Sequence, residues 1–274
     1  MRPCSTARCA PGLALVSTPS ASCTRAVEEE QFELHYQPLF DVSTGDLVRV
    51  EALARWHHPV RGLVPPAEFI AVAEETRLIV PFGEWVIQEA TRQAARWKQA
   101  RGGQNMPVAV NVASHQLASA ELPAVIDDAL AASGCLARDL AVEITESAVL
   151  ADIDAACRTL AALREIGVRV SVDDFGTGYS SLSYIQRLPI DELKIDRSFV
   201  APLGASSTTG AIVGSIVDLA HAVGLGVVAE GVETAPQLEA VGRLGCDLAQ
   251  GFYLGRPVAA GELAIADRHP LLAP

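Results

Sequence analysis

Hydrophobic and polar positions alternate one by one near the start of the chain. Residues 32–36 read FELHY, with hydrophobic side chains at every second position, which is the pattern of a strand with one buried face. The segment 43–46 (STGD) supplies turn residues, and a second strand is predicted over 47–56. The sequence therefore predicts a β-hairpin whose second strand puts Glu51, Leu53 and Arg55 on one face.

The hydrophobic spacing then changes to intervals of three and four residues, which is typical of amphipathic helices. Helices are predicted over 67–80 and 82–100, the first of them introduced by Pro65-Pro66. The segment before them, 57–62, reads HHPVRG. Two adjacent histidines could suggest a metal site, but beside Pro59 and Gly62 we interpret them as loop residues rather than ligands.

From residue 107 onward, predicted strands alternate with predicted helices. The strands are expected over 107–113, 139–146, 168–175, 192–199, 225–232 and 248–254. Helices are expected near 120–132, up to 166, near 180–188, over 209–223 and near 236–244. This alternation implies right-handed crossovers and a mainly parallel sheet. About eight strands in this length favour a closed α/β barrel, with one antiparallel strand supplied by the opening hairpin.

Composition narrows the class of protein. Half of the 274 residues are hydrophobic, which is enough for a large core. The net charge of -12 argues against a sequence-independent DNA or RNA partner, which would meet a basic face. No hydrophobic run is long enough to span a membrane. The six cysteines match no zinc or redox spacing, so we interpret them as reduced residues of a cytoplasmic protein.

The two ends of the chain differ from its middle. Residues 1–27 are rich in Ser, Ala, Thr, Pro and Cys, and we expect a disordered leader there. The barrel is predicted to occupy residues 28–262. Residues 263–274 are predicted to form a C-terminal tail.

Two adjacent aspartates, Asp173 and Asp174, end one predicted strand and are followed by Gly176-Thr-Gly178. Neighbouring side chains on a strand point to opposite faces, so both can serve one site only if the strand ends or bulges there. Two carboxylates at one point repel each other unless a cation or a shared proton relieves them. Taken alone, the pair would be a solvated turn.

Further polar residues stand at or near the ends of the other strands, where the site of such a barrel forms. With the aspartates, the set is Glu51, Asn111, Glu143, Asp173, Asp174, Lys194, Glu230 and Gln250. Oxygen donors without cysteine or paired histidines favour Mg²⁺ or Mn²⁺ over zinc or copper. Five carboxylates could hold two ions, an arrangement suited to attack on a phosphodiester.

Each member of this set also has an ordinary interpretation. Glu51 or Glu143 alone would more often be a surface or salt-bridged residue, and Lys194 could simply neutralise the aspartates. Carboxylates alone also allow a barrel glycosidase, although only 5% of the residues are aromatic. The coincidence of so many acids at strand ends favours a metal-dependent enzyme.

Several motifs in order resemble the EAL-domain family. They are VEALARW, DDFGTGYSSL, ELKID, AEGVE and QGFYLGRP, and the resemblance covers about 28–258. Members of that family are cyclic di-GMP-specific phosphodiesterases of bacterial signalling. The resemblance implies a modified TIM barrel and hydrolysis of cyclic di-GMP to linear pGpG. It also implies two Mg²⁺ or Mn²⁺ ions, with Ca²⁺ inhibitory.

The resemblance assigns roles to individual residues. Glu51, Asn111, Glu143 and Asp173 would hold one ion, and Asp173, Asp174 and Glu230 the second. Lys194 would act as a catalytic base with Glu51 and Glu230 as its catalytic companions. Glu146 would steady the loop after the aspartates, and that loop (175–183) with the next helix would form a homodimer interface. Positions near the substrate would be Gln37, Leu53, Arg55, Asp196, Gln250 and Tyr253.

The chain departs from the family pattern in places that leave every metal or catalytic group present. Asn111 is followed by Val-Ala-Ser-His, where the family usually has Val-Ser and an Arg; EALLRW reads EALARW; and Pro81 replaces an apolar residue. We therefore expect an active enzyme. The alternative is a catalytically weak or inactive cyclic di-GMP receptor or interaction module, a type that usually lacks a metal ligand.

Overall fold

Eight strands close into a barrel, as the computed structural model shows for residues 26, 29, 31–176, 185–204 and 207–263. Strands β2, β4, β5, β6, β7, β8 and β9 pair in parallel in that order. Strand β1 closes the ring by pairing antiparallel with both β2 and β9. The predicted barrel with a single antiparallel strand from the N-terminal hairpin is therefore confirmed.

The elements follow one another in the predicted order. The strands are β1 (Phe32–Asp41), β2 (Leu47–His58), β3 (Gly62–Val64), β4 (Val108–Asn111), β5 (Leu140–Thr145), β6 (Arg169–Phe175), β7 (Glu192–Ile195), β8 (Gly226–Ala229), β9 (Leu248–Ala249) and β10 (Val258–Ala259). The helices are α2 (Pro66–Glu75), α3 (Ile79–Ala100), α4 (Ser114–Leu117), α5 (Leu122–Ser133), α6 (Glu146–Ala151), α7 (Ile153–Ile166), α8 (Arg197–Val200), α9 (Ser207–Ala222) and α10 (Ala235–Arg243). Short 3₁₀ turns lie at Ala137–Asp139 and Ile185–Arg187.

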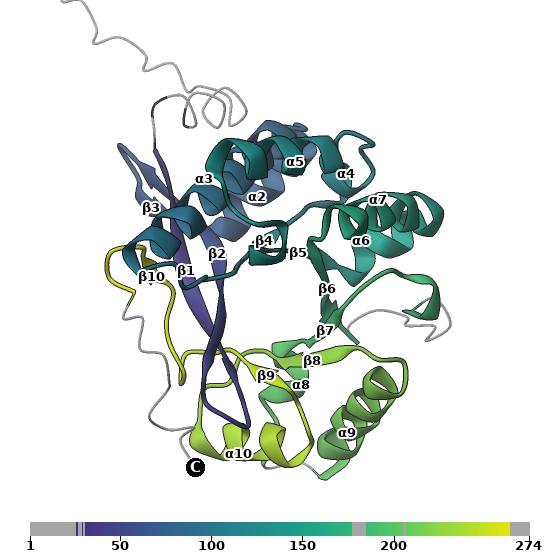
Figure 1. Cartoon of the computed structure of the whole chain (residues 1–274). Helices are drawn as coiled ribbons and strands as arrows, with labels where there is room; N and C mark the ends of the chain where they lie inside the picture. Colours follow the sequence, from purple (N-terminus) through teal and green to yellow (C-terminus); the bar gives the residue numbers. More distant parts are fainter. Residues whose placement is uncertain (1–25, 27–28, 30, 177–184, 205–206, 264–274) are drawn as a thin grey trace, which may run out of the picture.

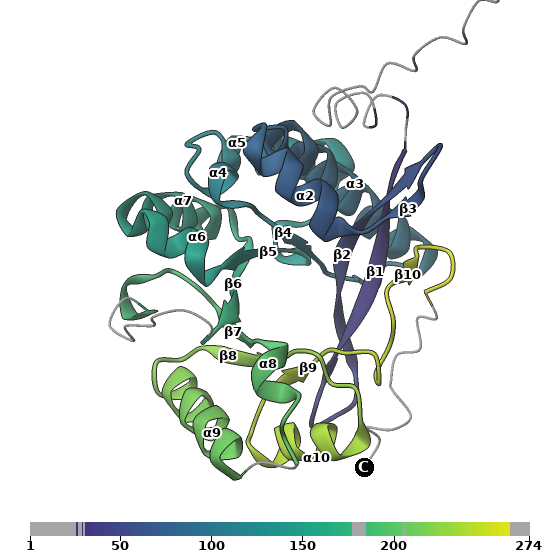
Figure 2. The ribbon, with the colours of Figure 1, turned by 180° about the vertical axis from the view of Figure 1, so that it is seen from behind.

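Helices surround the ring of strands on the outside (Figure 1). Seen from behind, α2 and α3 lie against the long β1–β2 hairpin, whose upper part extends beyond the neighbouring strands (Figure 2). Strand β2 pairs with β4 only through residues 50–52, so the remainder of the hairpin continues past the edge of the barrel. This extension gives the barrel a raised wall on one side.

An aromatic cluster fixes this wall to the helices. The Phe32 ring lies 5.4 Å from that of Trp56 across the two strands and 4.9 Å from that of Phe82 on α3. Buried aromatic pairs of this kind add about 0.5–1.5 kcal/mol each beyond the area they bury. Pro81 fits in the first turn of α3, where a missing N–H removes no helical hydrogen bond.

Several predicted boundaries were wrong. Strand β2 continues to His58, so His57 and His58 lie in a strand and not in a loop. Strand β7 ends at Ile195 because the side chain of Asp196 accepts a hydrogen bond from Ser198 N and starts α8. Strands β8 and β9 are also shorter than predicted.

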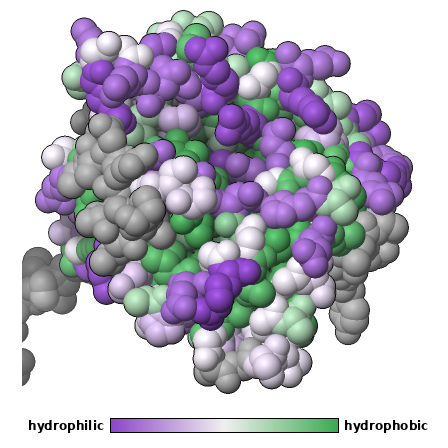
Figure 3. Space-filling model, turned by 60° about the horizontal axis from the view of Figure 1, so that its bottom comes forward, coloured by the Kyte–Doolittle hydropathy of each residue, from purple (hydrophilic) through white to green (hydrophobic). Residues whose placement is uncertain are grey.

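The surface shown in Figure 3 mixes hydrophilic and hydrophobic residues. No helix in the described ranges is long and apolar enough to cross a membrane.

Three predictions fall wholly or partly outside the described residues: the leader 1–27, the loop and short helix between Asp174 and residue 188, and the tail 263–274.

Candidate active site

Lys194 on β7 lies at the centre of the predicted group and has no exposed surface. Its Nζ atom has four carboxylate neighbours from four other strands or strand ends. The distances are 2.5 Å to Glu143 Oε2, 2.5 Å to Glu230 Oε1, 3.5 Å to Asp173 Oδ2 and 3.9 Å to Glu51 Oε2. Because the parallel strands all end at one edge, residues spread over 180 positions of sequence meet at one point.

Hydrogen bonds from amide side chains orient the carboxylate of Glu51. Asn111 Nδ2 donates to Glu51 Oε1 at 2.7 Å, and Gln250 Nε2 donates to Glu51 Oε2 at 2.8 Å. Gln250 also donates to Gln37 Oε1 at 3.0 Å, and Gln37 donates to the carbonyl of Gly255 at 2.9 Å. One oxygen of Glu51 is therefore held by Asn111 of β4 and the other by Gln250 after β9, and Gln37 of β1 fixes Gln250 in turn.

The two aspartates sit at an irregularity of β6. The pairing register with β7 shifts between Val172 and Phe175, and Asp174 has a left-handed backbone with φ of 56°. Aspartate is one of the few residues that tolerate this conformation, at a cost of about 1–3 kcal/mol. This is the bulge that the sequence required if both aspartates were to serve one site. The amide N of Asp174 also donates to Asp173 Oδ1 at 2.9 Å.

The group carries an excess of negative charge. Burial raises the pKa of Glu143 well above its ordinary value, and burial with the nearby Asp173 and Glu51 carboxylates raises the pKa of Glu230 to about 8. For Lys194 burial lowers the pKa, but the Glu143 and Glu230 carboxylates outweigh burial and hold it well above the usual value. One ammonium does not neutralise the carboxylates around it.

The donor atoms fit hard divalent cations. Within the described ranges, Glu143 Oε1 is buried and has no hydrogen-bond partner, and the same is true of Gln250 Oε1. A buried carboxylate oxygen without a donor is costly unless a cation or a proton meets it. The ligands predicted from the sequence are all oxygens, which suits Mg²⁺ or Mn²⁺.

Other predicted residues lie around this centre rather than in it. Burial raises the pKa of Asp174, and the Asp173 and Asp196 carboxylates add to the rise, which Lys194 partly offsets. Glu146 is buried at the start of α6, and its Oε2 accepts a hydrogen bond from Gly176 N at 3.1 Å. Tyr253 packs against the core.

Two pockets adjoin the group and meet at Leu53. The first, of about 190 Å³, is lined by Leu53, Glu51, Glu230 and Gln250 among others. The second, of about 240 Å³, is lined by Leu53, Arg55 and Asn111 among others. Sequence reasoning assigned no role to three further residues of the first pocket, Arg197, Glu233 and Phe252, although the AEGVE and QGFYLGRP motifs contain the last two.

Arg49 is a fourth residue to which the sequence assigned no role. It lies on β2 two residues before Glu51, is 1% exposed, and its Nη2 lies 2.5 Å from Glu192 Oε2. Ser171 Oγ donates to the same carboxylate oxygen at 2.8 Å. The fields of Glu192, Glu143 and Glu51 raise the pKa of Arg49 despite its burial. A fixed positive charge therefore lies within the field of the carboxylates, and no motif in the sequence signals it.

Comparison with known proteins places these residues in a family. Residues 20–257 match the EAL domain. The chain is 46% identical over 239 residues to the bifunctional diguanylate cyclase/cyclic di-GMP phosphodiesterase MucR of Pseudomonas aeruginosa, which covers 87% of this chain and 35% of MucR. It is 41% identical over 239 residues to the cyclic di-GMP phosphodiesterase NbdA of the same organism, covering 87% of this chain and 30% of NbdA. The chain thus spans about a third of the length of these curated relatives.

Solved structures agree. The phosphodiesterase part of MucR in complex with c-di-GMP superposes with a TM-score of 0.84 at 46% identity, covering 89% of this chain and 99% of that one. The EAL domain of Mycobacterium smegmatis DcpA superposes with a TM-score of 0.73 at 37% identity, covering 87% of this chain and 97% of that one. The chain belongs to the EAL domain family.

Proposed function

We propose that this chain hydrolyses one phosphodiester bond of cyclic di-GMP to give linear pGpG, with the aid of divalent cations. The observation that carries the proposal is the group of buried and partly buried carboxylates around the fully buried Lys194 at one end of the barrel. The names of MucR and NbdA, and the c-di-GMP complex of the MucR phosphodiesterase, supply the substrate.

We propose for the metal ligands the roles that membership of the EAL domain family suggests. Glu51, Asn111, Glu143 and Asp173 would hold one Mg²⁺ or Mn²⁺, and Asp173, Asp174 and Glu230 a second. When bound, such cations stabilise negative charge on the attacking and leaving oxygens of a phosphodiester. The unpartnered, buried Glu143 Oε1 supports a cation on the Glu143 side of the group. Ca²⁺ has a larger and more flexible coordination sphere, so we expect it to inhibit.

Lys194 is assigned to the attacking water. Its Nζ is fixed by Glu143 and Glu230 at 2.5 Å each, so its position is determined before substrate arrives. The surrounding carboxylates raise its pKa and keep its proton on Nζ. A general-base role therefore requires that the negative charge around Lys194 be neutralised, since a nearby positive charge lowers the pKa of an amine.

The two pockets meeting at Leu53 suit a substrate with two similar halves. Arg55, in the second pocket, is half-buried and can donate to a phosphate oxygen with geometry that lysine lacks. Phe252 in the first pocket has a ring exposed for stacking on a base, with the guanidinium carbon of Arg256 4.3 Å from its centroid. Gln37, Asp196, Gln250 and Tyr253 remain proposed substrate contacts.

Glu146 is proposed as a positioning residue for the segment after the aspartates. Its hydrogen bond from Gly176 N fixes the backbone two residues beyond Asp174. We also propose a homodimer through the loop and helix that follow.

The test is incubation of the purified chain with cyclic di-GMP and Mg²⁺ or Mn²⁺, with Ca²⁺ as the inactive cation, followed by chromatography of the products. Linear pGpG with Mg²⁺ or Mn²⁺, and none with Glu51→Ala, is the expected result. Glu239→Gln, at an exposed position of α10, is the matched control and should retain turnover. Tight binding of cyclic di-GMP without product would contradict the proposed hydrolysis and favour the receptor alternative.

A further inference from the structure

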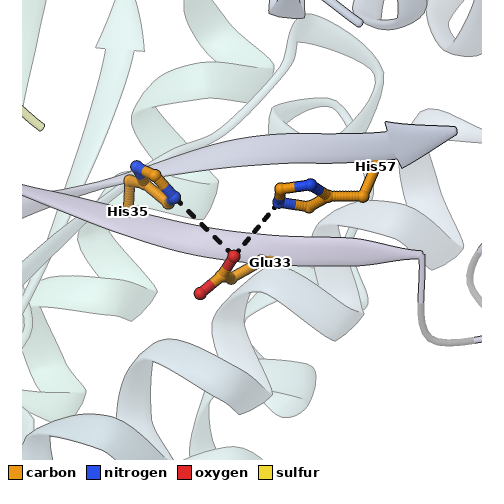
Figure 4. A group of neighbouring side chains, drawn as sticks. All are labelled: Glu33, His35 and His57. Carbon is orange, nitrogen blue, oxygen red and sulfur yellow. Dashed lines mark hydrogen bonds and ion pairs between the residues drawn. The ribbon is translucent and has the colours of Figure 1, made fainter. Parts of the chain in front are cut away.

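A second group of metal-ligating side chains lies on the raised β1–β2 wall. Glu33 and His35 are two residues apart on β1, so they share a face of the sheet. The strands pair Glu33 with Arg55, which places His57 diagonally across from Glu33 on the same face. Figure 4 shows the imidazoles of His35 and His57 pointing to the Glu33 carboxylate from opposite sides.

The three side chains converge on one oxygen. Nε2 of His57 lies 3.1 Å from Glu33 Oε2, and Nε2 of His35 lies 3.7 Å from the same atom. One ligand atom from each residue lies within 4.8 Å of the others. Among residues with a described placement, this is the only group of three or more His, Cys, Asp or Glu that meets this spacing.

The neighbouring histidine marks the limit of the group. His58 faces the opposite side of β2, where its ring lies 5.2 Å from that of Trp56. Its Nδ1 accepts hydrogen bonds from the amides of Val60 and Arg61, at 3.1 and 3.2 Å. The HHPVRG segment therefore contains one histidine that orders a turn and one that joins the group.

The strands beneath the group hold it in place. Phe32 and Trp56, on the opposite face of the hairpin, are buried against Phe69 and Phe82. Ligands on paired strands with a packed reverse face keep their relative positions better than ligands on loops. The side chains themselves remain open to water, with 22% of His35, 47% of Glu33 and 54% of His57 exposed.

We propose that Glu33, His35 and His57 bind one late transition-metal ion of the Zn²⁺ type, with water completing its coordination. Two imidazoles and a carboxylate form a ligand set that zinc uses in open, three-residue sites. Imidazole nitrogen favours Zn²⁺, Cu²⁺ or Ni²⁺ over Mg²⁺, which prefers oxygen. The ordinary alternative is that Glu33 only pairs with protonated histidines. This proposal does not depend on the proposed hydrolysis.

The site shares its strand face with the substrate pockets. His35 is paired with Leu53 and Glu33 with Arg55, and both partners line the second pocket. Four residues along the strand separate Glu51 from Arg55, about 13 Å at the usual rise per residue. A metal on Glu33 would therefore lie above the pockets and not among the inner carboxylates.

The experiment is calorimetric titration of the full chain, stripped with chelator, with zinc chloride in buffer containing millimolar Mg²⁺. We expect the original chain to bind one equivalent of zinc that His57→Gln does not bind. Even changes to groups that only support a ligand cost about 10–100-fold in metal affinity, so removing a ligand should cost at least about 100-fold. Glu33→Gln should have a similar effect, and His58→Gln should leave that equivalent in place.

Two further results decide the proposal. Titration with Co²⁺ should give visible ligand-field bands that disappear in His57→Gln and persist in Asp173→Asn, which changes only the inner group. Equal zinc affinity of the original chain and His57→Gln would overturn the proposal. Because the readout is metal binding and not turnover, an inactive enzyme would leave the result interpretable.

Discussion

The inner group around Lys194 and the outer group around Glu33 offer metals opposite environments. The inner group is built of carboxylates, two amides and one ammonium, and Lys194 and Glu143 have no exposed surface. The outer group consists of two imidazoles and one carboxylate that are largely open to water. Glu51 of the inner group points to the same face of the hairpin as the outer residues, because all of them occupy alternate positions along β1 and β2.

Burial and the type of ligand atom together determine which cations each group favours. Several carboxylates in a water-poor interior favour the binding of cations. In the proposed function, those cations would lie where a phosphodiester can be attacked. The exposed ligand atoms of the outer group already make hydrogen bonds to water, so only ions that prefer nitrogen ligands are expected to bind there.

The largest expected effect comes from removing an inner ligand. Glu51→Ala should lower turnover of cyclic di-GMP at least about 1,000-fold, because a lost metal ligand removes several kcal/mol of charge stabilisation in the transition state. Single-turnover chromatography of products measures this. Glu33→Gln, on the same face but in the outer group, should keep turnover in Mg²⁺. Comparable losses of turnover in the two variants would show that the inner and outer groups do not differ in their contribution to hydrolysis.

Lys194→Met should destabilise the metal-free protein. Removing one partner of a buried ion pair costs about 3–5 kcal/mol, because the carboxylates of Glu143 and Glu230 lose their countercharge. Urea unfolding with chelator present gives the free energy. Mn²⁺ should restore part of the loss by neutralising the same carboxylates. Stability unchanged by the substitution would show that Lys194 is not needed to balance the inner charge.

Glu146→Ala should reduce turnover about 10–100-fold. The variant leaves the partly buried Gly176 N without its acceptor, and losing such a hydrogen bond costs about 1 kcal/mol. Kinetics at several Mg²⁺ concentrations would separate weaker metal binding from slower chemistry. We expect saturating Mg²⁺ to restore part of the lost turnover. Wild-type kinetics in the variant would show that Glu146 has no positioning role.

The smallest effect is expected for the outer group without metal. His57→Gln should change the free energy of unfolding by less than about 0.5 kcal/mol, because its pairing with Glu33 is exposed to solvent. Thermal unfolding in chelator measures this, and the same scan with zinc should show stabilisation in the original chain only. A large loss in chelator would mean that His57 supports the fold, and would weaken its assignment as a ligand.

Much of the barrel was predictable because strand alternation and strand–helix order are local patterns. The bulge at Asp173 and Asp174 followed from geometry, since adjacent strand residues cannot otherwise face one site. The boundaries after β7 were wrong because Asp196 can end a strand by capping a helix, and local sequence does not show which role prevails.

The outer group illustrates what could not be predicted. Pro59 and Gly62 indicate a turn, but they do not show that β2 continues to His58 before turning. The pairing of His57 with Glu33 depends on the hairpin register, because a one-residue slip would turn the side chains of one strand to the opposite face. The charge of Arg49 near the inner carboxylates and the four contacts of Lys194 likewise depend on how distant strands come together.

We propose that two groups in this protein take different metals at different depths, and that Glu51 alone connects the inner group to the hairpin face of the outer one. Anomalous diffraction from a crystal equilibrated with one equivalent of Zn²⁺ and excess Mn²⁺, recorded on both sides of the zinc absorption edge, tests it directly. We expect a zinc peak between Glu33, His35 and His57, and manganese among Glu51, Glu143 and Asp173. Zinc among the inner carboxylates, with no peak at Glu33, would contradict it.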